Sequence, residues 1–130
     1  MNMLVGFDNT EISRAALNLA IDRAKRMGAN LKVVTSMLEG TDHDVKAIAK
    51  AETELEAAKK KAVDAGVNCD AHLLIRGMSS GEDLVNFAKE NDIEEIVVGI
   101  KRRSKVGKLL MGSTAQFVIL NAPCPVLTIR

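Results

Sequence analysis

Short apolar runs alternate along the chain with longer segments whose apolar residues recur at helical spacing, and this alternation constrains the fold most strongly. Five runs have the length and the β-branched content of strands. They lie at 3–7, 31–37, 67–75, 93–99 and 124–129. Because a helix separates each strand from the next, we expect a parallel sheet with helices on both faces. The sequence therefore predicts an α/β fold.

The predicted helices begin and end at residues that suit helix termini. The first helix follows residues 8–10, Asp-Asn-Thr, each of which can cap a helix start, and it ends at Gly28. The second helix spans 45–65, and the third begins after 78–81. The fourth spans 113–121 and is ended by the Ala-Pro pair that follows it.

Composition bounds the size of the fold and the kind of core. The 130 residues suffice for one domain with its own core, so we expect a single domain over residues 1–130. The chain has no Trp or Tyr and only three Phe, which predicts an aliphatic core rich in Ala. A formal net charge of +1 and an ordinary share of charged residues argue against disorder and against a nucleic-acid partner.

Cysteine usage and hydropathy bear on the compartment. Cys69 and Cys124 have no CxxC or Cys/His neighbourhood, so we expect buried free thiols rather than a metal or redox site. No apolar run approaches the roughly 20 residues that a membrane-spanning helix needs, and we expect no membrane partner. The chain start and the composition favour a reducing cytoplasm.

One basic stretch, 99–116, has the features of a ligand site. Gly99 ends the fourth strand, and ligands of such sheets bind beyond the carboxyl ends of the strands. Gly112 and Ser113 open the next helix, and Ser113 with Gln116 has the spacing of a capping box. The free N–H groups of a helix start suit a phosphate, and a glycine lets the backbone approach it. Five cations make the loop electropositive: Lys101, Arg102, Arg103, Lys105 and Lys108.

The stretch is neither a Walker P-loop nor a GxGxxG fingerprint. It resembles the motif of the universal stress proteins, G-x2-G-x9-G-[ST], which falls here on Gly99, Arg102, Gly112 and Ser113. LVGFDNTEISRAALNLA looks like the first strand and helix of that family, and VILNAPCPVLTIR looks like its closing helix and strand. The resemblance implies a flavodoxin-like, Rossmann-like sheet of order 3-2-1-4-5, with a cleft between strands one and four that binds ATP or AMP.

The resemblance also implies roles for individual residues. Asp8 would face the ribose or the adenine, and Ser36 and Met37 would border the base. The glycines of the motif and the residues after them would line the phosphates, with basic side chains nearby. The expected nucleotide-binding residues are therefore Asp8, Ser36, Met37, Gly99, Arg102, Arg103, Gly112, Ser113 and Thr114.

Alternatives remain open at three points. Arg102 replaces the second glycine of the motif, so its side chain either narrows the phosphate pocket or binds the phosphates itself. Asp8 has a second interpretation, as the N-cap of the first helix. The basic stretch also has a second interpretation, as a solvated loop whose cations are neutralised by the acidic cluster that precedes it. That cluster comprises Glu82, Asp83, Glu90, Asp92, Glu94 and Glu95.

Two functions fit these patterns. The first is a cytoplasmic adenine-nucleotide-binding regulator of the stress response, with at most slow hydrolysis, because the loop offers hydroxyls and cations but no general base or carboxylate pair. Mg²⁺ would accompany ATP rather than occupy a site of its own, and we predict no catalytic residues. The second is a nucleotide-free interaction module whose site is altered by Arg102. The family resemblance implies a homodimer formed through the C-terminal strand, 124–130, whose β-branched edge invites pairing.

Overall fold

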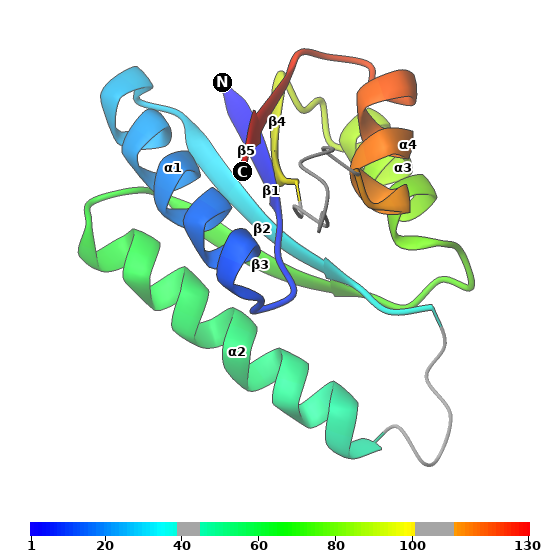
Figure 1. Cartoon of the computed structure of the whole chain (residues 1–130). Coiled ribbons are helices and arrows are strands. Elements are labelled where there is room, and N and C mark those ends of the chain that lie inside the picture. The colour runs from blue at the N-terminus through cyan, green and yellow to red at the C-terminus, as the bar shows by residue number, and fades with distance from the viewer. Residues whose placement is uncertain (39–44, 101–110) are drawn as a thin grey trace.

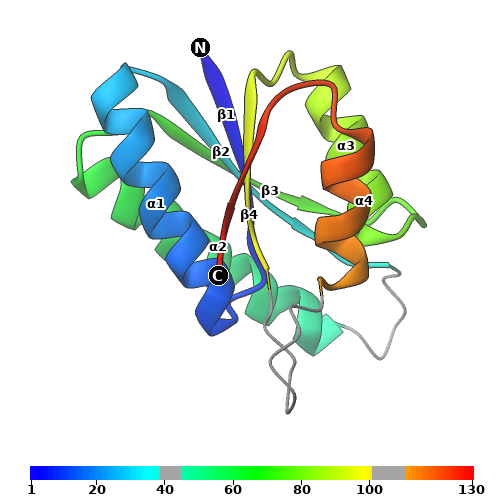
Figure 2. The same ribbon diagram turned by 45° about the horizontal axis from the view of Figure 1, so that its top comes forward.

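A computed structural model describes residues 1–38, 45–100 and 111–130 of the chain. The described residues form a five-stranded parallel sheet with α1 and α2 on one face and α3 and α4 on the other (Figures 1 and 2). The strands are β1 (Asn2–Gly6), β2 (Asn30–Ser36), β3 (Cys69–Leu74), β4 (Glu95–Gly99) and β5 (Val126–Ile129). The helices are α1 (Glu11–Met27), α2 (Val45–Asp64), α3 (Ser80–Glu90) and α4 (Ser113–Asn121).

The strand order is β3-β2-β1-β4-β5, which confirms the predicted fold class. β1 lies at the centre and pairs in parallel with both neighbours, Met3 lying opposite Leu31 of β2 and opposite Glu95 of β4. β2 and β3 extend the sheet from one side of β1, and β4 and β5 extend it from the other side, so along the chain the strand order reverses between β3 and β4. Parallel sheets open a crevice at such a reversal, at the carboxyl ends of the two strands concerned. Here these strands are β1 and β4.

Three strands begin later than predicted, two of them because the preceding helix ends use the residues in question. Val67 donates its N–H to the carbonyl of Ala62 in α2, and Ile93 donates its N–H to Ala88 in α3, so both residues close a helix end instead of opening a strand. β5 begins at Val126 rather than at residue 124, although the carbonyl of Pro125 already accepts the N–H of Ile96. An apolar residue buried beside a helix end is indistinguishable by pattern from the first residue of a strand.

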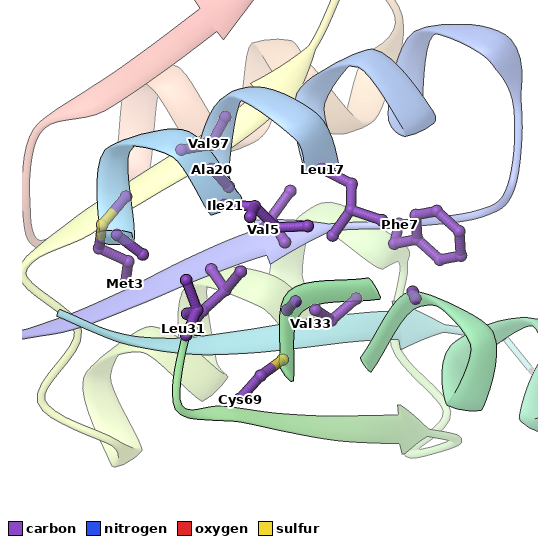
Figure 3. Close-up of a cluster of buried hydrophobic side chains, with 14 of the residues drawn as sticks. Met3, Val5, Phe7, Leu17, Ala20, Ile21, Leu31, Val33, Cys69 and Val97 are labelled. Atoms are coloured by element: carbon purple, nitrogen blue, oxygen red, sulfur yellow. The ribbon is translucent and has the colours of Figure 1, made fainter. Parts of the chain in front are cut away.

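The core is aliphatic, as predicted, and is divided by the sheet. One cluster lies beneath α1 and α2 and includes Met3, Val5 and Val33 (Figure 3). The other lies beneath α3 and α4 and includes Leu4 and Ile96. Alternate residues of β1 thus pack on opposite faces, which is the two-sided burial expected of a central parallel strand.

Both cysteines are free thiols, but only one is buried. Cys69 lies in the core beneath α2, where burial raises the pKa of its thiol to about 11. Cys124 lies just before β5 and is half-buried, so the expectation of two buried thiols was wrong for this residue. Among the described helices, none is both long enough and apolar enough to cross a membrane.

Candidate functional site

A cavity of about 590 Å³ opens at the carboxyl ends of β1, β2 and β4, and the N-terminal residues of α1, α3 and α4 line it. These strand ends and the first turns of α1 and α4 lie at the same end of the sheet (Figure 2). The volume is within the range of cavities that bind cofactor-sized molecules. Six predicted residues line it, from four elements or their flanking turns: Asp8, Ser36, Gly99, Gly112, Ser113 and Thr114.

The start of α4 forms one end of this cavity. Gly112 is the N-cap, and the first intrahelical bond runs from the N–H of Gln116 to the Gly112 carbonyl. Ser113 is therefore the first helical residue, and the predicted capping box of Ser113 with Gln116 is wrong because a capping box needs serine at the N-cap. Glycine has no side chain with which to cap. The N–H groups of Ser113, Thr114 and Ala115 thus precede the first helical bond at the cavity wall.

The two motif glycines that the structure describes have different physical reasons to be glycine. A Cβ on Gly99 would lie 2.7 Å from Cγ1 of Ile12 and 2.9 Å from the Ile12 carbonyl oxygen, so this glycine permits α1 to pack against the end of β4. A Cβ on Gly112 would meet no atom of the described residues within 4 Å. Its backbone torsions, φ −65° and ψ 158°, are accessible to any residue. Packing against the described residues therefore does not require a glycine at position 112.

Asp8 organises the turn between β1 and α1. Its Oδ1 accepts hydrogen bonds from the backbone N–H and the hydroxyl of Thr10. Thr10 is the N-cap, and its hydroxyl oxygen accepts the N–H of Ser13 at 3.3 Å. The interpretation of Asp8 as the N-cap of α1 is therefore wrong, although the residue supports the cap. Asp8 remains exposed and lines the cavity.

A buried carboxylate lies behind the opposite end of the cavity. Asp83 of α3 has no exposed surface, and its Oδ2 accepts the hydroxyl of Ser36, at the end of β2, at 2.7 Å. Its Oδ1 accepts Nε of Arg76 at 2.6 Å. The guanidinium of Arg76 also donates to Glu90 at 2.8 Å, and the hydrogen bonds to both acids raise the pKa of Arg76. Ser80 donates its hydroxyl to the Ser36 carbonyl at 3.3 Å.

Comparison with known proteins shows which family the chain resembles. A model of the universal stress protein family matches residues 1–130. The chain belongs to this family. The universal stress protein of Mycolicibacterium smegmatis is 32% identical over 128 residues, which cover 98% of this chain and 96% of that protein.

Two solved universal stress protein structures from Archaeoglobus fulgidus have the same fold. One aligns with a TM-score of 0.90 at 35% identity, and the alignment covers 100% of this chain and 98% of that one. The other, a complex with dAMP, aligns with a TM-score of 0.83 at 32% identity and with the same coverage. The fold is therefore that of a universal stress protein.

The structure separates the predicted site residues of this universal stress protein into three groups. Six of them line one cavity, as described above. Met37 follows the cavity residue Ser36 but is not among the lining residues, and its backbone N–H bonds to the Leu74 carbonyl of β3. Arg102 and Arg103 lie outside the described residues. No group of three potential metal ligands among His, Cys, Asp and Glu occurs within the described ranges.

Sequence reasoning missed the residues that hold Ser36. Asp83 was placed only in an acidic cluster expected to meet the basic stretch, and Arg76 was given no role. Among the described contacts, Asp83 and Glu90 bind Arg76, and Glu95 binds Arg23 at 2.7 Å. The sequence did contain a sign that Asp83 is buried and paired. Asp83 lies four residues before Phe87, and both occupy the buried face of α3. An acid within an apolar helical stripe needs a partner, and Arg76 is seven residues away.

Proposed function

We propose that this universal stress protein binds an adenine nucleotide, ATP or AMP, in the cavity beyond β1 and β4, and that it acts as a regulator of the stress response. The observation that carries the proposal is the uncapped start of α4 at one end of a 590 Å³ cavity. Support comes from the A. fulgidus relative, 32% identical over the whole chain, whose structure is a complex with dAMP.

The phosphates would lie at the start of α4. The N–H groups of Ser113 and Thr114 and the positive end of the helix dipole suit an anion. No atom of the described residues lies within 4 Å of the position of a Cβ on Gly112, which leaves room there for an oxygen to approach the backbone. In this proposal Arg102 and Arg103 add positive charge beside the phosphates, since a guanidinium matches phosphate geometry.

The nucleoside would lie toward β1 and β2. Apolar side chains of Val34, Leu84 and Val98 line that part of the cavity and offer a surface for a base. Asp8 and Ser36 supply the polar groups there, with Met37 bordering the base from outside the lining. A ligand that spans the cavity in this way would reach from the end of β2 to the start of α4.

We propose regulation rather than rapid catalysis. Among the described lining residues, Asp8 is the one carboxylate, and it is already bonded to Thr10. Phosphoryl transfer needs groups that position the attacking oxygen and usually a held metal ion. Hydrolysis of ATP would therefore be slow at most, with Mg²⁺ bound through the nucleotide. A cytoplasmic location fits the two free thiols, which persist in a reducing compartment.

Nucleotide content and affinity test the proposal. Acid extraction of the purified protein should release adenine nucleotide, and calorimetric titration should give a dissociation constant for AMP and for ATP. Gly112→Val places two methyl groups at the cavity end, where no described atom lies within 4 Å, so it should weaken both ligands about tenfold or more while lowering the unfolding midpoint only slightly through the poorer N-cap. Affinity that survives this substitution would remove the α4 start from the site.

The alternative is a homodimeric interaction module that binds no nucleotide. The edge strand β5 supports the dimerisation that this alternative requires. β5 pairs with β4 alone among the described strands. The carbonyls of Pro125 and Ile129 accept hydrogen bonds from β4 and the residue after it. Successive residues of a strand direct their backbone N–H and C=O groups to opposite sides, so those of Thr128 face the open edge of the sheet. We propose that two chains associate through residues 124–130 in either function.

Light scattering tests the dimer. Thr128→Pro removes an N–H at the open edge without removing a bond to β4, so it should shift the protein from dimer to monomer. Thr128→Ala keeps the N–H and is the matched control, which should stay dimeric. A wild-type protein that is monomeric at micromolar concentration contradicts the dimer. No bound nucleotide at millimolar AMP or ATP, together with a stable dimer, would favour the interaction module.

A further inference from the structure

Asp83 is held in a state in which it can only accept hydrogen bonds. Its carboxylate has no exposed surface and receives Nε of Arg76 at 2.6 Å, and its backbone carbonyl receives a second guanidinium nitrogen at 3.2 Å. Arg76 stays charged, and burial next to a fixed cation favours an ionised partner. An ionised carboxylate has no proton to donate. The group that faces Oδ2 must therefore supply one.

That group is the hydroxyl of Ser36, 2.7 Å away. A serine hydroxyl has one proton and two lone pairs, so a proton given to Asp83 leaves only lone pairs for any ligand. Ser80 is in the same position, since its hydroxyl donates to the Ser36 carbonyl at 3.3 Å. Both residues line the cavity. The hydroxyls at this end of the cavity therefore act as acceptors and not as donors.

We infer that Ser36, held by Asp83 and Arg76, is the hydrogen-bond acceptor that selects a purine with a 6-amino group over one with a 6-oxo group. The inference rests on the proposed nucleotide binding and adds to it the basis of base selection. A 6-amino group donates to the Ser36 oxygen, whereas a 6-oxo group places two lone pairs against each other. Asp83 and Arg76 touch no ligand in this arrangement, so they are positioning residues.

The first experiment needs no variant. Wild-type protein is titrated by calorimetry with AMP, with purine riboside 5′-monophosphate, which lacks the 6-substituent, and with IMP, which carries a 6-oxo group. Affinity should fall in that order, with IMP about tenfold to a hundredfold weaker than AMP, because IMP both loses a hydrogen bond and faces an acceptor. Equal affinity for AMP and IMP overturns the inference alone. Failure to bind any of the three overturns the proposed function as well.

The second experiment places the selectivity on Ser36. Ser36→Ala should lower the preference for AMP over IMP to about threefold or less, because the acceptor is gone. Ser113→Ala, at the phosphate end, should weaken AMP and IMP equally and leave their ratio unchanged. Ser79→Ala is the matched control, since Ser79 is exposed, lies next to Ser80 and bonds Glu82 rather than lining the cavity. A preference that survives Ser36→Ala overturns the inference.

The third experiment reverses the direction of the hydrogen bond. In Asp83→Asn, the amide oxygen should face the donor Arg76, which turns the amide NH₂ toward Ser36. The Ser36 hydroxyl then accepts from Asn and is free to donate its proton to a ligand. IMP should gain affinity relative to AMP by about tenfold or more compared with wild type. An AMP preference equal to that of wild type in a folded Asp83→Asn protein contradicts the inference.

Discussion

The two ends of the cavity are built in opposite ways. At the α4 end, the N–H groups of the first helical turn precede the first intrahelical bond, and no described residue fills the space beside Gly112. At the β2 end, the hydroxyls of Ser36 and Ser80 are already bonded, and a buried ion pair fixes Asp83 behind them. The first end offers donors to an anion, and the second offers acceptors in one fixed orientation. A molecule with a phosphate at one end and an amino group at the other matches both.

The comparison extends to the glycines of the motif. Gly99 and Gly112 are both glycines of the motif, yet a Cβ on Gly99 would collide with Ile12, whereas a Cβ on Gly112 would meet none of the described residues. The glycines of one motif can therefore be required for different reasons, one for packing and the other for ligand binding. The difference between them is measurable, because substitution should damage stability at one glycine and binding at the other.

The largest expected effect is on stability at Gly99. Gly99→Val forces a side chain against the backbone of Ile12, so it should lower the free energy of unfolding by about 3 kcal/mol. Gly112→Val, with no described neighbour within 4 Å, should lower it by no more than about 1 kcal/mol, because glycine suits an N-cap better than valine does. Urea denaturation followed by circular dichroism measures both. Similar losses in the two variants would show that the glycines do not differ in the way described.

A smaller effect on stability is expected at Asp83. Asp83→Ala removes the partner of both Ser36 and Arg76 in a fully buried position, which should cost about 2 kcal/mol, since Arg76 keeps Glu90 and some exposure. Glu82→Ala is the control on the adjacent residue, whose carboxylate accepts the hydroxyl of the exposed Ser79. It should change stability by less than about 0.5 kcal/mol. Equal effects of the two substitutions would contradict the structural role of Asp83.

The smallest expected effect is at the α4 end and concerns binding. Ser113→Ala keeps the backbone N–H groups and removes one hydroxyl, so AMP affinity should fall by about fivefold, corresponding to about 1 kcal/mol. Titration with adenosine, which has no phosphate, provides the contrast, because its affinity should not change. A loss of the same size for adenosine would place the hydroxyl near the nucleoside instead of the phosphate.

The sequence predicted the fold well because the information was local. Alternating apolar runs, Gly28 at the end of α1 and the Ala-Pro pair after α4 are features of neighbouring residues, and all lie where expected. Strand starts were less accurate where a buried residue such as Val67 belongs to a helix end. The capping box failed for a similar reason, because Ser113 and Gln116 fit the pattern one residue away from the actual N-cap.

The site was predicted in part, and the missing part is non-local. Ser113 and Gly112 follow from a motif within one loop and helix. The link from Ser36 to Asp83 joins residues 47 positions apart, and it depends on how α3 packs against the end of β2. The spacing of residues along the chain does not predict that contact. Family resemblance gave Ser36 a place beside the base but not the direction of its hydrogen bond.

The central claim is that the start of α4 holds the phosphate of a nucleotide. A crystal structure of the protein with AMP tests it most directly. We predict phosphate oxygens within about 3 Å of the backbone nitrogens of Ser113 and Thr114, with the base toward Ser36. A bound nucleotide whose phosphate lies away from these nitrogens, or a start of α4 closed by the side chain of Arg102, would contradict the account.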